Sequence, residues 1–171
     1  MQNIRAEEVE KLTSFIPPYP GTAIFHMADE GVGFCRMLQA YADERGYIYH
    51  PVSADEAFVE ALQHAGVSKV RKITYRQQRY NQHSRQYDYI YIAIDPLSLE
   101  KPKLFMKKIY AIAKNAAKIL FFVPKDRADP ASLEQLLDEG NFVAINPIDD
   151  IFDDYLVLSA QKMHGWGVYD M

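Results

Sequence analysis

Apolar residues along this chain gather in two kinds of segment, and the first kind is short and continuous. These runs are rich in β-branched and aromatic residues, and they span residues 22–27, 47–50, 70–75, 89–94 and 119–123. Such runs predict β-strands, and several of them lack strict alternation of apolar and polar positions. We therefore expect strands that are buried on both faces.

The second kind of segment is longer and amphipathic, with apolar residues three or four positions apart. It predicts helices at residues 7–15, 32–45, 55–65, 101–117 and 131–139. Gly46, Gly66 and Gly140 follow the second, third and fifth of these helices, as expected for residues that end a helix. Ser53 precedes the third helix as a candidate N-cap.

The order of these elements predicts the fold class. Strands that alternate with helices favour an α/β protein with a single doubly wound, mostly parallel sheet covered on both faces. Near the end of the chain, residues 142–146 and 155–161 form two strand-like runs with no helix between them, and such strands are most easily antiparallel. We predict a seven-stranded sheet that closes with a C-terminal antiparallel hairpin. The 171 residues leave room for a single domain over residues 1–171.

Composition narrows the class of protein. Hydrophobic residues make up 49% of the chain and aromatic residues 13%, as in ordinary folded proteins. Cys35 is the single cysteine, which excludes an internal disulfide framework and a zinc site built from cysteines. The apolar runs are too short to cross a bilayer, and residues 1–11 contain no apolar signal core. We expect a cytoplasmic protein that does not bind a membrane.

The order of elements resembles one family over nearly the whole chain. A helix, five alternating strand–helix units and a terminal antiparallel hairpin resemble the class I, Rossmann-like S-adenosylmethionine-dependent methyltransferases. Residues 87–90, which lead into the fourth strand, and the closing run 155–162 are part of this resemblance. It implies S-adenosylmethionine as cofactor and transfer of a methyl group to an acceptor that the sequence does not name. Fold does not settle function, so the alternative is a non-catalytic binding or assembly module that has lost the cofactor site.

The first strand–helix turn of that family is rich in glycine, which lets the backbone approach the cofactor closely. Here Gly31 and Gly33 form a Gly-x-Gly pair, and Ala28 or Asp29 stands where the family has an earlier glycine. The resemblance implies that Ala28, Asp29, Gly31 and Gly33 bind the cofactor. The alternative is a plain tight turn in which Asp29 and Glu30 favour the positive end of the next helix.

Two further family positions are altered. An acid at the end of the second strand normally accepts hydrogen bonds from the ribose, but here His50 or Pro51 falls at that place, and Asp55 comes too late. A neutral imidazole accepts one hydrogen bond, whereas a carboxylate accepts two. After the third strand, Arg76 cannot accept a hydrogen bond from adenine, whereas Tyr75 can stack on a purine. The resemblance implies His50, Ser53 and Tyr75 as cofactor-binding residues.

The turn after the fourth strand supplies the candidate catalytic residues. Asp95 and Pro96 resemble the first half of the Asp-Pro-Pro-Tyr turn in methyltransferases that act on nucleic acids and protein amines, where oxygens orient the target nitrogen. Leu97 and Ser98 do not match the second half. The alternative is a strand that ends in an ordinary Asp-Pro turn.

Two histidines are predicted at the same edge of the sheet. His26 and His50 fall at the carboxyl ends of predicted parallel strands, the edge at which open α/β sheets bind ligands. They are expected to converge with Asp29, Glu30 and Asp95. A metal site from these residues is conceivable, but their spacing follows no metal motif and we assign none.

Charge is distributed unevenly along the chain, although the net charge is only −4. Residues 61–87 contain six Lys or Arg and no acid, with Tyr75 and Tyr80 among them, whereas acids dominate residues 126–154. Basic and aromatic residues together can bind single-stranded nucleic acid. We favour a solvated loop instead, one that can pair with the acidic segment within the chain or across a homodimer.

Overall fold

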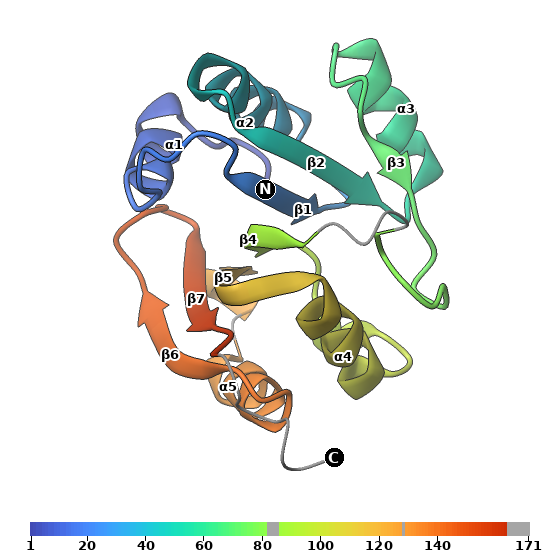
Figure 1. Ribbon diagram of the computed structural model, residues 1–171, viewed down its shortest axis with the longest axis vertical. Helices are drawn as coiled ribbons and strands as arrows, with labels where there is room; N and C mark the ends of the chain where they lie inside the picture. Colours follow the sequence, from blue (N-terminus) through green and yellow to red (C-terminus); the bar gives the residue numbers. More distant parts are fainter. Residues whose placement is uncertain (82–85, 128, 164–171) are drawn as a thin grey trace.

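The computed structural model describes residues 1–81, 86–127 and 129–163, and these form one α/β unit (Figure 1). Seven strands make a single sheet in the order β3-β2-β1-β4-β5-β7-β6. Their bounds are Ala23–Met27 (β1), Ile48–Ser53 (β2), Arg71–Lys72 (β3), Tyr87–Ile92 (β4), Ala113–Pro124 (β5), Val143–Ile148 (β6) and Tyr155–Gln161 (β7). The strands from β1 to β5 pair in parallel, and β7 runs antiparallel to both β5 and β6. The predicted parallel sheet with a terminal antiparallel hairpin is confirmed.

Helices cover both faces of the sheet, as the continuous apolar strands require. Their bounds are Ala6–Thr13 (α1), Val32–Arg45 (α2), Glu56–His64 (α3), Pro102–Ile112 (α4) and Pro130–Glu139 (α5), with short 3₁₀ turns at Pro96–Ser98 (η1) and Lys125–Arg127 (η2). Helices α1, α2 and α3 pack on one face, and α4 and α5 on the other. Adjacent residues of β1 serve the two cores, since Ile24 faces the first and Phe25 the second.

One predicted helix is too long. The sequence pattern predicts a single helix over residues 101–117, but α4 ends at Ile112 and β5 begins at Ala113. The Lys162 ammonium donates to the carbonyls of Tyr110 (3.0 Å) and Ala113 (2.9 Å), where the helix ends. The Lys162 backbone also pairs with Ala116 and Ala117. Pairing with Lys162, which directly follows β7, therefore overrides the helical propensity of this segment.

The third strand–helix unit departs from the predicted alternation. The predicted strand at residues 70–75 shortens to β3, and the described residues 73–81 form turns and irregular backbone, as expected for the loop that we favour for the basic segment. Tyr80 occupies that face of the sheet: it is 2% exposed and its ring packs against Phe105 of α4, with centroids 5.8 Å apart. Because Tyr80 belongs to the core, it is not available to stack on a nucleic-acid base.

Candidate functional site

The carboxyl ends of β1, β2 and β4 meet at one edge of the sheet, and the turn between β1 and α2 lies over it. Ala28 is buried and continues the sheet, since its N–H donates to the Val52 carbonyl (3.1 Å). Gly31 then reverses the chain into α2 with φ +92°, a conformation that favours glycine. Gly31 and Gly33 line a pocket of about 700 Å³ at this edge. We call this region the crevice.

Three carboxylates gather at the mouth of the crevice, and we call Asp29, Glu30 and Asp55 the acidic cluster. Asp29 accepts a hydrogen bond from the buried Ser53 hydroxyl (3.0 Å), and the same hydroxyl accepts from the Asp55 N–H (3.0 Å). Much of the Asp29 surface is exposed to solvent. The protein around its carboxylate nevertheless removes part of the hydration, and this desolvation raises the pKa of Asp29. The charges of Asp55 and Glu30 raise it further, against the lowering effect of Ser53. The cluster therefore favours a cationic partner.

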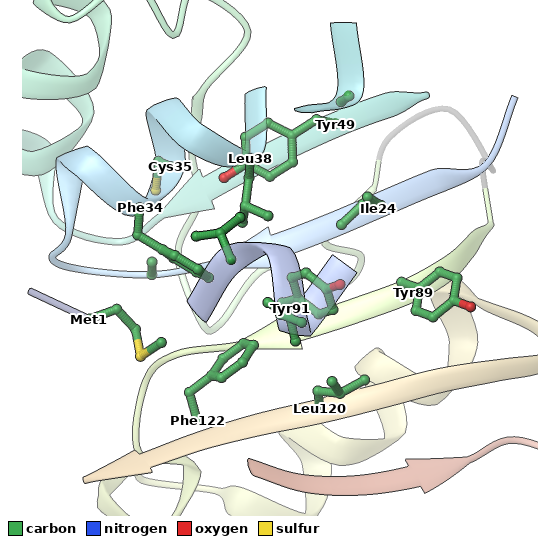
Figure 2. Packing of buried hydrophobic residues seen from close by; sticks show 14 of the residues in the cluster. Met1, Ile24, Phe34, Cys35, Leu38, Tyr49, Tyr89, Tyr91, Leu120 and Phe122 are labelled. Carbon is green, nitrogen blue, oxygen red and sulfur yellow. The ribbon is translucent and has the colours of Figure 1, made fainter. Parts of the chain in front are cut away.

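That cation is the chain's own first residue. The Met1 ammonium lies 2.9 Å from Glu30 Oε1, and Met1 is 2% exposed. Its carbonyl covers Gly31 so closely that a Cβ on this glycine would lie 2.5 Å from the Met1 oxygen. Figure 2 shows the Met1 side chain at the edge of the aromatic cluster formed by Phe34 and Phe122. Residue 1 thus fills part of the crevice.

Asp55 lies closer to the end of β2 than the sequence pattern indicates, because that pattern ends the second strand too early. The structure extends β2 through Ser53, so Asp55 follows the strand end by two residues. Proline is rare inside a sheet, which makes Pro51 look like a strand end. Successive N–H groups of a strand point to opposite neighbours. Because the Ile48 N–H donates toward β1, the backbone nitrogen of Pro51, three residues later, points toward β3. There β3 pairs only with Val52 and Ser53, so the missing N–H of Pro51 breaks no ladder.

The predicted convergence of the two histidines is wrong. His50 lies in the middle of β2, opposite Phe25, and its Nδ1 is 2.8 Å from the Tyr87 hydroxyl on the α4 face. His26 lies on the opposite face, fully buried, with its Nδ1 2.7 Å from the Tyr49 hydroxyl. The crevice pockets are lined by other residues. His50 is therefore removed from the set of residues expected to contact a cofactor.

Burial keeps the His26 ring in its neutral form. Desolvation, with a smaller contribution from the Met1 ammonium, lowers the pKa of His26 to about 3. Cys35 lies 3.8 Å from the same ring, and burial raises the pKa of this thiol to about 11. Both groups are neutral near pH 7, so they act as parts of the core. Among the described residues, no three His, Cys, Asp or Glu side chains are grouped to hold a metal ion.

Asp95 and Pro96 lie where β4 ends, beside the crevice. Asp95 Oδ1 accepts a hydrogen bond from the Leu97 N–H (3.0 Å) and caps η1, and Pro96 is buried. A pocket of about 280 Å³ brings Asp95 together with Asp29 and the half-buried Tyr75. Three predicted site residues from the ends of β1, β3 and β4 therefore share one hollow.

A second hollow lies on the other side of Met1. It has a volume of about 230 Å³ and is lined by Asp95, Phe122, Asp129 and Tyr155, among others. Met1 lines both this hollow and the pocket of the acidic cluster, so it lies at the boundary between them.

The two charged segments lie at opposite edges of the sheet, since β3 is one edge strand and β6 the other (Figure 1). Among the described residues, these edge strands are therefore too far apart for the predicted pairing within one chain, and Arg85 of the basic segment lies outside the described residues. Near β3 the ion pairs are Arg76 with Glu100 (3.2 Å) and Lys72 with Glu56 (3.3 Å). Pairing across a homodimer stays a prediction. None of the described helices is long and apolar enough to cross a membrane.

Comparison with known proteins identifies the fold. No protein-family model and no curated protein matches the sequence. Among solved structures, a TehB-like SAM-dependent methyltransferase from Corynebacterium glutamicum aligns with TM-score 0.70 and 13% identity, over 94% of this chain and 90% of that one. The CurJ carbon methyltransferase aligns with TM-score 0.71 and 12% identity, over 91% of this chain and 52% of that one.

A third similar structure contains the cofactor. Phosphoethanolamine N-methyltransferase 2 of Haemonchus contortus, in complex with S-adenosyl-L-methionine, aligns with TM-score 0.67 and 13% identity. The alignment covers 91% of this chain and 52% of that one. The chain thus spans about half the length of this enzyme and of the CurJ enzyme. At such low identities the likeness shows the fold, which is that of the class I, Rossmann-like methyltransferases.

Proposed function

We propose that this chain binds S-adenosylmethionine in the crevice and transfers its methyl group to an acceptor that faces Asp95. The turn at Gly31 is the observation that carries the proposal. Its positive φ, and the 2.5 Å that would separate a Cβ at this position from the Met1 carbonyl, mean that this turn accepts a group placed directly against the backbone. The group present there is a methionine with its ammonium on Glu30, and it shares the α-ammonium and the methionine carbon skeleton with the amino-acid end of the cofactor.

The residues of the crevice fit the rest of the cofactor. Asp29 and Glu30 would hold its ammonium, and the first N–H groups of α2, which begins at Val32, would favour its carboxylate. Asp55 would supply an acceptor for the ribose hydroxyls, which His50 does not, and Tyr75 would flank the purine. When bound, the cofactor supplies an activated methyl group on a sulfonium.

The chain's own contribution to transfer is positioning. Methyl transfer is an in-line displacement, so holding the acceptor at the correct angle provides most of the acceleration. The Leu97 N–H fixes one oxygen of Asp95, and the other oxygen of this carboxylate can orient the acceptor. The Phe122 ring forms part of the wall on this side. The acceptor itself is unassigned.

A second candidate function is a non-catalytic binding or assembly module, and the position of Met1 favours it. A residue that is 2% exposed in the crevice is packed as part of the core. In this case the acidic cluster contacts Met1 and needs no ligand.

Thermal unfolding with S-adenosylhomocysteine separates the two candidates. Ligand at a hundred times its dissociation constant stabilises a protein by about 2.7 kcal/mol. We expect the rise in Tm to shrink in Asp55→Asn and to persist in Asp129→Asn. The two variants are matched because each aspartate caps a helix, α3 or α5, and asparagine keeps that cap. A wild-type Tm that does not move with ligand refutes cofactor binding and leaves the module.

A further inference from the structure

Helices α4 and α5 pack on the same core cluster and lie side by side on one face of the sheet (Figure 1). Their outward side chains form a surface that we call the helical face. It comprises Lys103, Leu104 and Lys107 of α4 and Gln135, Asp138 and Glu139 of α5, all of which are exposed. A groove of about 560 Å³ lies between the two helices, and none of its lining residues belongs to the pockets of the crevice.

The groove is apolar and open to solvent. Leu104 of α4 is 43% exposed and Leu97 of η1 is 37% exposed. They line the groove together with Pro102 and the buried Leu136. Large apolar side chains that gather in a hollow with charged residues around it are typical of a surface that contacts another protein.

The two helices carry charges of opposite sign. Helix α4 contains three lysines and no acid, whereas α5 contains three acids and no base. One pair, Lys103 with Glu139, already bridges the groove at 3.4 Å. In the described part of the chain, neither Lys107 nor Asp138 lies within ion-pair distance of an opposite charge. The helical face therefore has one basic half and one acidic half, and each half has a charge that no neighbour balances.

This division of charge selects the partner. A partner of a single charge sign would be repelled by one half of the face, whereas a second copy of the chain offers each half its opposite. With a twofold axis along the groove, α4 of each copy lies over α5 of the other. An axis across the groove would stack α4 on α4 and α5 on α5, and like charges would then oppose each other.

We infer that the helical face is the contact surface of a homodimer in which α4 of each copy packs on α5 of the other. The face is small, because α4 has 11 residues and is thus about 16 Å long, and two helices side by side are about 20 Å wide. Interfaces of this size belong to the weaker class. We therefore expect a dimer that dissociates in the micromolar range. The inference goes beyond the proposed function and does not depend on methyl transfer.

Sedimentation velocity of the whole chain, followed across micromolar concentrations, tests this interface. The wild type should pass from monomer to dimer as its concentration rises. Lys103→Glu/Lys107→Glu gives both halves of the face an acidic surface, and Asp138→Lys/Glu139→Lys gives both a basic one. Each variant alone should lose about tenfold or more in dimer affinity, because like charges are then opposed across the interface.

Mixing the two variants provides the decisive result. In a mixed dimer, the acidic α4 of one chain faces the basic α5 of the other, and the reverse holds for the second pair of helices. The equimolar mixture should therefore dimerise again. Both variants are expected to fold, because all four positions are exposed. An acid at position 103 suits the start of α4, and lysines at positions 138 and 139 suit the last turn of α5.

The matched control is Lys69→Glu/Arg79→Glu. It changes the charge by the same amount at exposed positions near β3, and its dimer affinity should stay within about twofold of the wild type. A wild type that stays monomeric at every concentration, or a mixture that fails to dimerise, overturns the inference. Loss of the dimer in the control overturns it too, because the contact would then run through the basic segment.

Discussion

Replacing Gly31 by alanine tests how the N-terminal residue packs on the crevice turn. The substitution forces an alanine into the left-handed region at φ +92° and places its methyl 2.5 Å from the Met1 carbonyl. The neighbouring atom is backbone, so relief requires that Met1 move away from the turn. The variant thus combines local backbone strain with displacement of a buried residue.

The two costs can be worked out separately. A residue other than glycine in the left-handed region costs about 1–2 kcal/mol. Expelling the Met1 side chain from the core loses about 1.5–3 kcal/mol of burial. The Met1–Glu30 ion pair adds little, since the Glu30 side chain is 52% exposed. We therefore expect Gly31→Ala to lower the free energy of unfolding by about 2.5–5 kcal/mol.

Two other glycines provide matched controls in urea unfolding. Gly46→Ala has the same kind of strain, at φ +70°, but nothing lies within 4 Å of the new methyl, so only about 1–2 kcal/mol should be lost. Gly33→Ala adds a methyl at a helical position with open space around it, and it should be neutral or stabilising by up to about 1 kcal/mol. If Gly31→Ala costs no more than Gly46→Ala, Met1 is not packed against this turn.

Three further predictions concern buried polar groups. Because the pKa of His26 falls from 6.5 to about 3 on folding, the unfolded chain alone binds this proton between those values. Stability should then fall by about 1.4 kcal/mol for each pH unit below 6.5, and urea unfolding of His26→Gln across this interval should lack that slope. The buried Cys35 thiol should react with an aromatic disulfide reagent only in denaturant, and fast labelling of the native protein would contradict its burial. Burial alone would raise the pKa of Glu8, but hydrogen bonds from the N–H groups of Arg5 and Asp153 outweigh it and lower the pKa. Glu8→Gln should therefore lower the free energy of unfolding by about 1–3 kcal/mol at neutral pH. The loss should shrink as the pH falls through the pKa of folded Glu8. Equal stability of the two proteins at neutral pH would rule this out.

Periodicity in the sequence is enough to predict most of this fold. It fails where contacts with distant segments determine whether residues form a helix or a strand. Four helices begin and end within two residues of the predicted bounds, although the N-cap of α3 is Asp55 and not the predicted Ser53. Residues 113–117 favour a helix locally, and pairing with Tyr87 of β4 and with Lys162 makes them a strand. The predicted second strand ends before Pro51, because proline is rare inside a sheet. The local sequence does not reveal that the neighbouring strand β3 is too short to pair with Pro51.

The candidate site is predictable in part for the same reason. Asp29, Tyr75 and Asp95 follow three parallel strands, so topology alone brings them to one edge. Asp55 escapes prediction because the strand end is misplaced by about three residues when only local signals are used. Met1 carries no signal in the sequence, since its place in the crevice depends on Glu30 and Gly31 folding toward it.

The position of Met1 sets a condition on any ligand of the crevice. Its burial, about 1.5–3 kcal/mol, weakens a competing ligand by about tenfold to a hundredfold, a penalty that a cofactor of good intrinsic affinity can overcome. Its charge is more restrictive. Removing the Met1 ammonium leaves Asp29, Glu30 and Asp55 together, a cluster in which the pKa of Asp29 is already raised by its neighbours. A ligand that takes this place must therefore bring a positive charge of its own. S-adenosylmethionine, with an ammonium and a sulfonium, meets this condition, whereas a neutral nucleoside does not.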